Sequence, residues 1–403
     1  MKKLVMMAMV LVASATAFAG DSDALKAIKK AKTYADAAAL LQTAQLANDE
    51  ERADAYNKLV DLALDKVSKE TGIIAQNQAA VQLGTGKEEA YDTLGLAENI
   101  CNAINAAIEC NKYDQLPNAK GKVKPQFAEK NPARIWAVRN HLVNIGQDMA
   151  RKGDNAAVLK YWGAYLDSSA DPFFAAQDHQ AEKAYIGQVA YYAGRYAAEA
   201  QDMERAKKYL GIAMQDAEMK KDAQNFLFYV MRSTLKTKAD TLNYISEMKE
   251  LYAQEPENDE ILGNLFSIYD GLKDKAAQTE LLDNHLAKYP NSYIALANKG
   301  LMAMSDNNAD EGATWFKKAV AANPENAAVQ TYLGICLNAQ AGGTDDAAKR
   351  KALYEEAIAA FDKAKQLDPN KVQVNWGYNR YQAYYNYYGA DAPETKDAEL
   401  DAK

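Results

Sequence analysis

The sequence predicts an all-helical protein that grows by repetition of helix pairs, and three observations lead to this fold class. Alanine is abundant, whereas the 21 glycines and 9 prolines are few and clustered. Clear runs of alternating β-branched residues, which would indicate strands, are absent. Prolines recur 34 residues apart at Pro256, Pro290 and Pro324. Such a fixed period is typical of stacked helical repeats, which can exceed the size of one ordinary domain.

Residues 1–19 have the parts of a secretory signal peptide. Lys2 and Lys3 give a positive start, an apolar run follows, and Ala17 and Ala19 are the small residues that a signal peptidase recognises. The apolar run is too short to span a bilayer comfortably, and no later stretch approaches the ~20 apolar residues of a transmembrane helix. We therefore expect an exported protein without a transmembrane segment, located in the periplasm or secreted.

Residues 20–115 are predicted to form a divergent helical segment. Within it, the stretches 50–70 and 88–113 have the apolar periodicity of amphipathic helices. Residues 116–130 are predicted to be a linker, because the stretch 114–127 contains two prolines, one glycine and three lysines.

About six repeats are predicted over 131–369, counted from the third residue after each repeating proline. Position 8 is small and position 24 is large, which lets two antiparallel helices approach closely. Gly300 and Gly334 occupy position 8, and Phe316 and Phe361 occupy position 24. In two earlier repeats, Gly146 and Gly194 occupy position 8, and Trp162 and Leu210 occupy position 24. The residues between Pro172 and Gly187 are extra to this pattern.

This pattern resembles the tetratricopeptide repeat family, most clearly from about residue 187 to residue 369. The resemblance implies a right-handed superhelix, an α-solenoid of antiparallel helix pairs whose first helices line a concave groove. One subclass of the family binds the C-terminal carboxylate of chaperones with Lys at position 5 and Asn at position 9. Neither residue recurs at those positions here, so a chaperone-tail clamp is not supported.

The resemblance also indicates which residues face the groove, since positions 2, 5, 9, 12 and 13 usually do so in this family. The middle repeats place six side chains there: Gln188, Tyr191, Arg195, Phe226, Tyr229 and Lys236. Aromatic rings together with cations suit a peptide, an acidic partner or a sugar. We expect this part of the groove to be the main contact surface. The alternative is that these side chains only fill the interior of the superhelix.

Charge and motif content argue against other function classes. The formal charge is −8, which is unfavourable for binding nucleic acid. No G-x-S-x-G motif, which would indicate a serine hydrolase, is present. The three histidines are His141, His179 and His285, and none of them has a cysteine or a second histidine at metal-ligand spacing. We expect no enzymatic activity, no cofactor and no metal. The three cysteines are expected to be small core residues: Cys101, Cys110 and Cys336.

Two function classes remain. The first is a non-catalytic interaction or scaffold module of the cell envelope that binds a protein or peptide partner. The alternative is a glycan-binding helical-repeat protein with aromatic contact residues, and an exposed cluster of Trp or Tyr would favour it. The four tryptophans are scattered along the sequence, which counts against this alternative.

The last helix is predicted over 370–389 and is rich in tyrosine. On a helix, one stripe is expected to pack as a cap on the repeats: Tyr378, Tyr381, Tyr385 and Tyr388. Tyr384 and Tyr387 lie off this stripe and are predicted as a possible C-terminal contact. Residues 390–403 have little apolar content and are predicted to be a disordered acidic tail.

Overall fold

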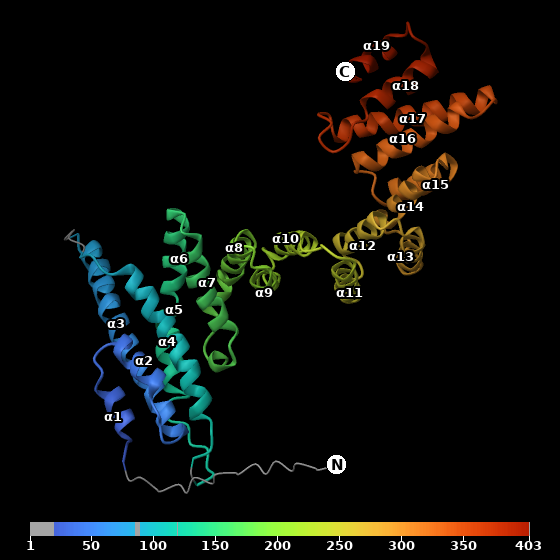
Figure 1. The fold of residues 1–403 in the computed structure, drawn as a ribbon. Helices are drawn as coiled ribbons and strands as arrows, with labels where there is room; N and C mark the ends of the chain where they lie inside the picture. Colours follow the sequence, from blue (N-terminus) through green and yellow to red (C-terminus); the bar gives the residue numbers. More distant parts are fainter. Residues whose placement is uncertain (1–19, 85–88, 119, 403) are drawn as a thin grey trace, which may run out of the picture. The chain divides into compact units, whose positions relative to one another are not determined.

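The structure is a computed structural model that describes residues 20–84, 89–118 and 120–402. The predicted signal peptide, residues 1–19, lies outside the described residues. Every regular element in the described ranges is helical, which confirms the all-α class (Figure 1). The described residues divide into two compact units, with the boundary between Ser233 and Thr234. Each helix within the described ranges is too short or too polar to cross a lipid bilayer.

The first unit contains helices α1 to α10 and two short 3-10 turns. Two long helices, α3 and α4, lie side by side, and α1 and α2 pack on α3. One continuous cluster of buried side chains runs from Leu25 in α1 to Val230 in α10. The elements are α1 (Asp23–Lys30), α2 (Tyr34–Thr43), α3 (Asp49–Gln82), α4 (Thr93–Asp114), α5 (Lys130–Arg139), α6 (His141–Lys152), α7 (Asn155–Ala170), η1 (Pro172–Phe174), η2 (Ala181–Ala184), α8 (Ile186–Glu199), α9 (Met203–Ala213) and α10 (Lys220–Ser233).

The segment predicted as a linker is anchored at its C-terminal end to the helix that precedes it. The carboxylate of Asp114 accepts hydrogen bonds from the backbone N–H groups of Gln126, Phe127 and Ala128, at 2.8 to 3.1 Å. Helices before and after residues 116–130 also share the core cluster of the first unit. The boundary between the two units falls at residue 233 instead.

The second unit contains helices α11 to α19. One buried cluster centres on Leu262 and Leu282, and a second extends over Phe316, Phe361 and Trp376. The elements are α11 (Lys238–Gln254), α12 (Asp259–Gly271), α13 (Lys275–Lys288), α14 (Tyr293–Ser305), α15 (Ala309–Ala322), α16 (Ala327–Gly342), α17 (Ala347–Leu367), α18 (Gly377–Tyr388) and α19 (Pro393–Asp401).

The pairs of small and large residues predicted from the repeat pattern meet in the structure. A Cβ atom added to Gly334 would lie 2.6 Å from the ring of Phe361, and one added to Gly300 would lie 2.7 Å from the ring of Phe316. The same contact recurs in the first unit, between Gly146 and Trp162 and between Gly194 and Leu210. The predicted close approach of the two helices in these repeats is therefore confirmed.

The repeat predicted over 225–258 contains the boundary between the units. Arg232 stands at position 8 of this repeat, where four other repeats have glycine. The two helices of this repeat fall in different units, with α10 packed on α9 and α11 packed on α12.

The turns inside the repeats share one local conformation. Position 15 has a positive φ at Gly153, Gln201, Lys273 and Asn307, with values from 57° to 75°. The next residue is Asp or Asn, whose side chain caps the second helix of the pair. These repeats therefore reverse direction through one left-handed residue followed by an N-cap.

The prediction that one tyrosine stripe of the last helix packs on the repeats is wrong. Tyr378, Tyr385 and Tyr388 are 57%, 46% and 47% exposed. The buried face of α18 instead carries Tyr384, whose hydroxyl donates to Asp362 at 2.8 Å. Burial raises the pKa of the Tyr384 hydroxyl to about 12.

Tyr387, the second predicted contact residue, also packs inward. It is half-buried against the core cluster of the second unit, and the Lys351 Nζ lies 5.4 Å from its ring centre. The inner face of α18 differs from the predicted one because it is formed by Arg380, Ala383 and Tyr384. The Arg380 guanidinium donates to Asp362 at 2.7 Å. A pattern of apolar residues does not reveal this polar anchor.

The prediction of a disordered tail over 390–403 is also wrong for most of its described part. Helix α19 (Pro393–Asp401) begins with proline at its first position and packs against α18. Ala398 is fully buried, and the Asp401 carboxylate accepts from Arg380 at 2.8 Å. Small and charged residues make the contact between α19 and α18. Low apolar content therefore led to the wrong prediction of disorder.

Candidate binding surface on helices α8 and α10

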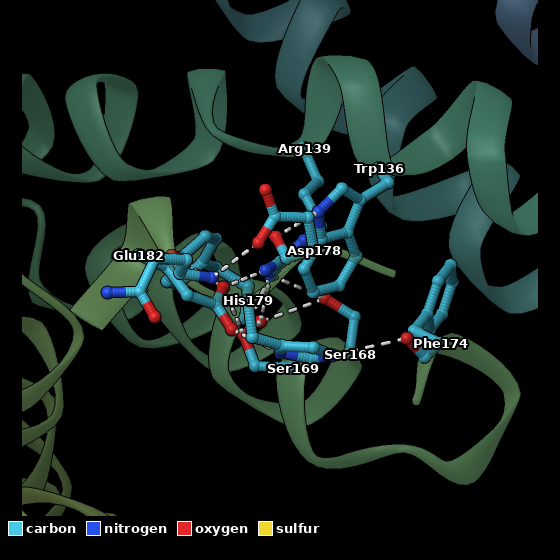
Figure 2. A network of polar contacts seen from close by, with 10 residues as sticks. Trp136, Arg139, Ser168, Ser169, Phe174, Asp178, His179 and Glu182 are labelled. Atoms are coloured by element: carbon cyan, nitrogen blue, oxygen red, sulfur yellow. Dashed lines mark hydrogen bonds and ion pairs between the residues drawn. The ribbon is translucent and has the colours of Figure 1, made fainter. Parts of the chain in front are cut away.

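Helix α8 begins beside a buried ion pair between Arg139 and Glu182. Arg139 ends α5, and Glu182 lies in η2, directly before α8. Their side chains are 1% and 6% exposed. Figure 2 shows the surrounding network, in which Arg139 donates to Ser169 Oγ at 2.8 Å and to the Tyr165 carbonyl at 3.0 Å. The guanidinium centre lies 3.5 Å from the ring centre of Trp136, so the entry to α8 is fixed on several sides.

The same network holds the residues that interrupt the repeat pattern. The Nδ1 atom of His179 lies 2.6 Å from a Glu182 carboxylate oxygen, and its Nε2 atom lies 3.2 Å from the Phe174 carbonyl oxygen. Trp136 donates from its ring N–H to the Asp178 carbonyl at 3.0 Å. The extra stretch thus folds as two short turns over the end of α5, an arrangement without a local signal in the sequence.

Ser169, His179 and Glu182 are the residue types of a hydrolytic triad, but their order is different. The Ser169 hydroxyl donates to Glu182 at 3.1 Å, and His179 contacts Glu182 as well. The carboxylate therefore stands between serine and imidazole. In a triad the imidazole stands in the middle and takes the proton of the serine. The His179 imidazole contacts Glu182 and the Phe174 carbonyl rather than Ser169, so these three residues do not have the arrangement of a triad.

Helix α8 presents three of the predicted groove residues on successive turns. Gln188 and Arg195 are exposed, and Tyr191 is half-buried. The ring of Tyr191 lies 5.4 Å from that of Tyr192, which is 41% exposed. Gly194, in the same helix, packs closely against Leu210 of α9.

Helix α10 contributes Phe226 and Tyr229. Their rings stack with 5.6 Å between centres and 23° between planes. Tyr229 is 65% exposed, whereas Phe226 packs partly against the core. The Cζ atom of Arg195 lies 5.9 Å from the ring centre of Phe226, which connects the two helices. We refer to five residues together as the aromatic–arginine surface: Gln188, Tyr191, Arg195, Phe226 and Tyr229.

The sixth predicted residue, Lys236, belongs to the second unit and is not part of the aromatic–arginine surface. It is exposed, and its backbone N–H donates to Asp240 at 3.1 Å. Tyr192 was missed because it stands at position 6, which does not usually face the groove. The only signal for it is the Tyr-Tyr doublet on a helix.

Arg195 differs from nearby cations in its electrostatic surroundings. Arg205 is paired with Asp202 at 2.6 Å, and Lys208 is paired with Asp167 at 2.7 Å. Arg195 has no carboxylate partner within the described ranges. Its positive charge is therefore available to an external anionic group.

A hollow of about 620 Å³ lies between α4, α7, α8 and α9, and it includes none of the predicted residues. Lys160 on its wall is paired with Glu98 at 2.6 Å, so part of its charge is neutralised. Cys101 also lines the hollow, and burial raises the pKa of its thiol to about 12. The described residues contain no group of three or more His, Cys, Asp or Glu side chains placed to hold a metal ion.

The helix pairs define an all-helical repeat fold, an α-solenoid, whose repeat pattern resembles that of tetratricopeptide repeats.

No protein-family model and no curated protein matches the sequence. Three solved structures illustrate the structural likeness. A crystal structure of MamA is 15% identical, with 47% of this chain and 96% of that chain covered and a TM-score of 0.29. A human IFIT1 dimer with m7Gppp-AAAA is 13% identical, with 94% and 77% covered and a TM-score of 0.36. Naa15/Naa10 bound to HypK-THB is 13% identical, with 94% and 62% covered and a TM-score of 0.35. These scores are low, so the fold assignment rests on the helix pairs themselves.

Proposed function

We propose that this chain is a non-catalytic protein interaction module of the cell envelope that binds an extended acidic segment of a partner on the aromatic–arginine surface. The observation that carries the proposal is the exposed Arg195 guanidinium beside the stacked rings of Phe226 and Tyr229. A guanidinium without an internal carboxylate favours an external one, since charge-assisted hydrogen bonds are among the stronger polar contacts. The rings add contact area that excludes water.

The rigidity of the surface supports this role. Helix α8 is fixed at its start by the Arg139 and Glu182 ion pair, and Phe226 packs against the core. A binding site on rigid helices loses little conformational entropy when a partner binds. Tyr and Arg are also the residues that most often dominate binding energy at protein interfaces.

The overall charge of −8 would repel an acidic partner at long range. Charges more than about 8 Å away are largely screened at physiological salt, so repulsion from the rest of the chain is weak at contact range. Arg195, without a carboxylate partner and next to exposed aromatic rings, then favours this surface as the place where an acidic segment binds. The predicted signal peptide at 1–19 supports the location, because it would deliver this surface outside the cytoplasm.

Selection from a random peptide display library tests the proposal with the purified chain. We expect selected peptides to be enriched in Asp or Glu next to apolar residues. Arg195→Glu should weaken the binding of a selected peptide by about 30-fold or more, the effect of losing a contact worth ~2 kcal/mol. Arg195→Lys should retain part of the affinity, because it keeps the charge and loses the planar fork.

Two matched controls accompany this selection. Lys349→Glu makes the same change of charge on an exposed side chain of the second unit and should leave binding unchanged. Tyr378→Ala removes a similarly exposed tyrosine from α18 and should also have no effect. Selected peptides without acidic enrichment, or equal losses in the controls, would contradict the proposal.

A further inference from the structure

The outward face of α18 carries tyrosine rings and amide side chains. Tyr378, Tyr381, Gln382 and Tyr385 are three or four residues apart, so they share one face of the helix. Tyr378 and Tyr385 are 57% and 46% exposed. The Tyr381 and Tyr385 rings lie 5.9 Å apart at 55°, and Gln382 donates to the Tyr378 hydroxyl at 3.3 Å. Asn386 is exposed at the edge of this face. We call these five residues the tyrosine–amide face.

The exposed rings of Tyr378 and Tyr385 lie away from the contacts that hold α18 in place. The helix is anchored through its other side, where Arg380 binds Asp362 and Asp401 and where Tyr384 donates to Asp362. Helix α19 covers that side as well, since a Cβ atom on Gly377 would collide with the Asp401 backbone. The tyrosine–amide face is therefore available on a helix that is already fixed.

The face has no formal charge. The stretch from Val372 to Ala390 contains one charged residue, Arg380, and its side chain is 7% exposed and paired. An acidic or basic ligand would find no opposite charge there. The chemistry fits a ligand that is neutral and rich in hydroxyl groups.

We propose that the tyrosine–amide face binds neutral glycans. The apolar C–H face of a sugar ring packs on a tyrosine ring, and its hydroxyls can donate to and accept from the amide groups of Gln382 and Asn386. This site lies in the second unit and shares no residue with the aromatic–arginine surface of the first unit. It is a second binding site, independent of the peptide surface.

An array of immobilised oligosaccharides tests this site with the chain that follows the predicted signal peptide. The probes are neutral glucans, xylans, mannans and chitin oligomers, matched with uronic-acid and sulfated glycans. We expect retention on neutral probes and a loss of about tenfold or more in Tyr385→Ala, the effect of ~1.4 kcal/mol. Tyr385→Phe should retain most of the binding, because the ring remains. Gln382→Ala should weaken it, because an amide partner is lost.

Controls separate this proposal from the proposed peptide function. Tyr229→Ala and Arg195→Glu should leave glycan retention unchanged, whereas Tyr378→Ala should reduce it. Since Tyr378 and Tyr385 are exposed, their substitution should leave the helical circular dichroism spectrum and thermal midpoint intact. Three results would overturn the glycan site: no retention of neutral probes, equal retention of the acidic probes, or retention that is insensitive to Tyr378 and Tyr385. Capture of a protein through these tyrosines without any glycan binding would overturn it as well.

Discussion

The guanidinium of Arg195 lies over the ring of Phe226, with 5.9 Å from Cζ to the ring centre. This contact connects α8 to α10, the first helices of two consecutive predicted repeats. Phe226 in turn stacks on the more exposed ring of Tyr229. A partner on this surface would contact two helices at once, which explains how a modest set of side chains could bind an extended segment.

The glycines at position 8 give a direct test of the packing within repeats. Gly334→Ala would place a Cβ atom 2.6 Å from the ring of Phe361, which is fully buried, so the ring or the helix would have to shift. We expect this substitution to lower the stability of the second unit by about 1–3 kcal/mol. The measurement is urea unfolding of the full chain, followed by hydrogen exchange in α16 and α17.

The matched control is Gly263→Ala, in the interior of α12. No heavy atom lies within 4 Å of a Cβ placed there. Alanine should therefore stabilise the unit by up to ~1 kcal/mol through its helix propensity. Equal effects at Gly263 and Gly334 would show that the packing at position 8 is not as close as described.

The Arg139 and Glu182 ion pair predicts a local effect of mutation. Arg139→Ala leaves the Glu182 carboxylate buried without its partner, which typically costs about 3–5 kcal/mol. We expect residues 171–190 to lose most of their protection from hydrogen exchange, while the second unit keeps its protection. The double variant Arg139→Met/Glu182→Leu should recover much of this loss. Unchanged exchange in the single variant would argue against a fixed entry to α8.

Helix α19 gives a test of the C-terminal cap. Ala398→Glu would bury a charge at a position that is fully covered, so α19 should detach and the second unit should unfold at a lower temperature. Lys396→Glu, an exposed position in the same helix, should leave the thermal midpoint unchanged. If Ala398→Glu were neutral, α19 would not form part of the folded second unit.

The cysteines allow a prediction from pKa. Burial raises the pKa of Cys101 and Cys110 to about 12 and that of Cys336 to about 11, so each remains a thiol at pH 8. Because the thiolate is the reactive species, native protein should react slowly with iodoacetamide at pH 8. All three should react once the chain is unfolded in urea. Fast labelling of any of them in the native protein would show that it is accessible and ionised.

The repeat architecture could be predicted from sequence because it depends on local residue types at a fixed period. Gly300 and Gly334 indicate a close helix approach without knowledge of the rest of the fold. The groove residues Tyr191, Arg195 and Tyr229 followed from the same period, and the structure places them on α8 and α10. Their role as a binding surface stays a prediction.

The errors arose where distant polar contacts decide the arrangement. The inner face of α18 is set by Asp362 and Asp401, which lie on other helices and have no periodic signature. Apolar periodicity therefore selected the wrong tyrosine stripe. The turns η1 and η2 depend in the same way on Arg139, whose carboxylate partner is 43 residues away in sequence. Such pairs are found only once the helices are packed.

Photo-crosslinking in intact cells tests the central claim most directly. A photoreactive amino acid replaces Tyr229, and the crosslinked partner peptide is identified by mass spectrometry. The account predicts one discrete adduct whose crosslinked segment is rich in Asp or Glu, and the adduct should disappear when Arg195→Glu is added. A probe at Tyr378, in the second unit, should not give this adduct. An adduct at Tyr229 that persists in Arg195→Glu, or whose segment lacks acidic residues, would contradict the claim that this surface binds an acidic partner.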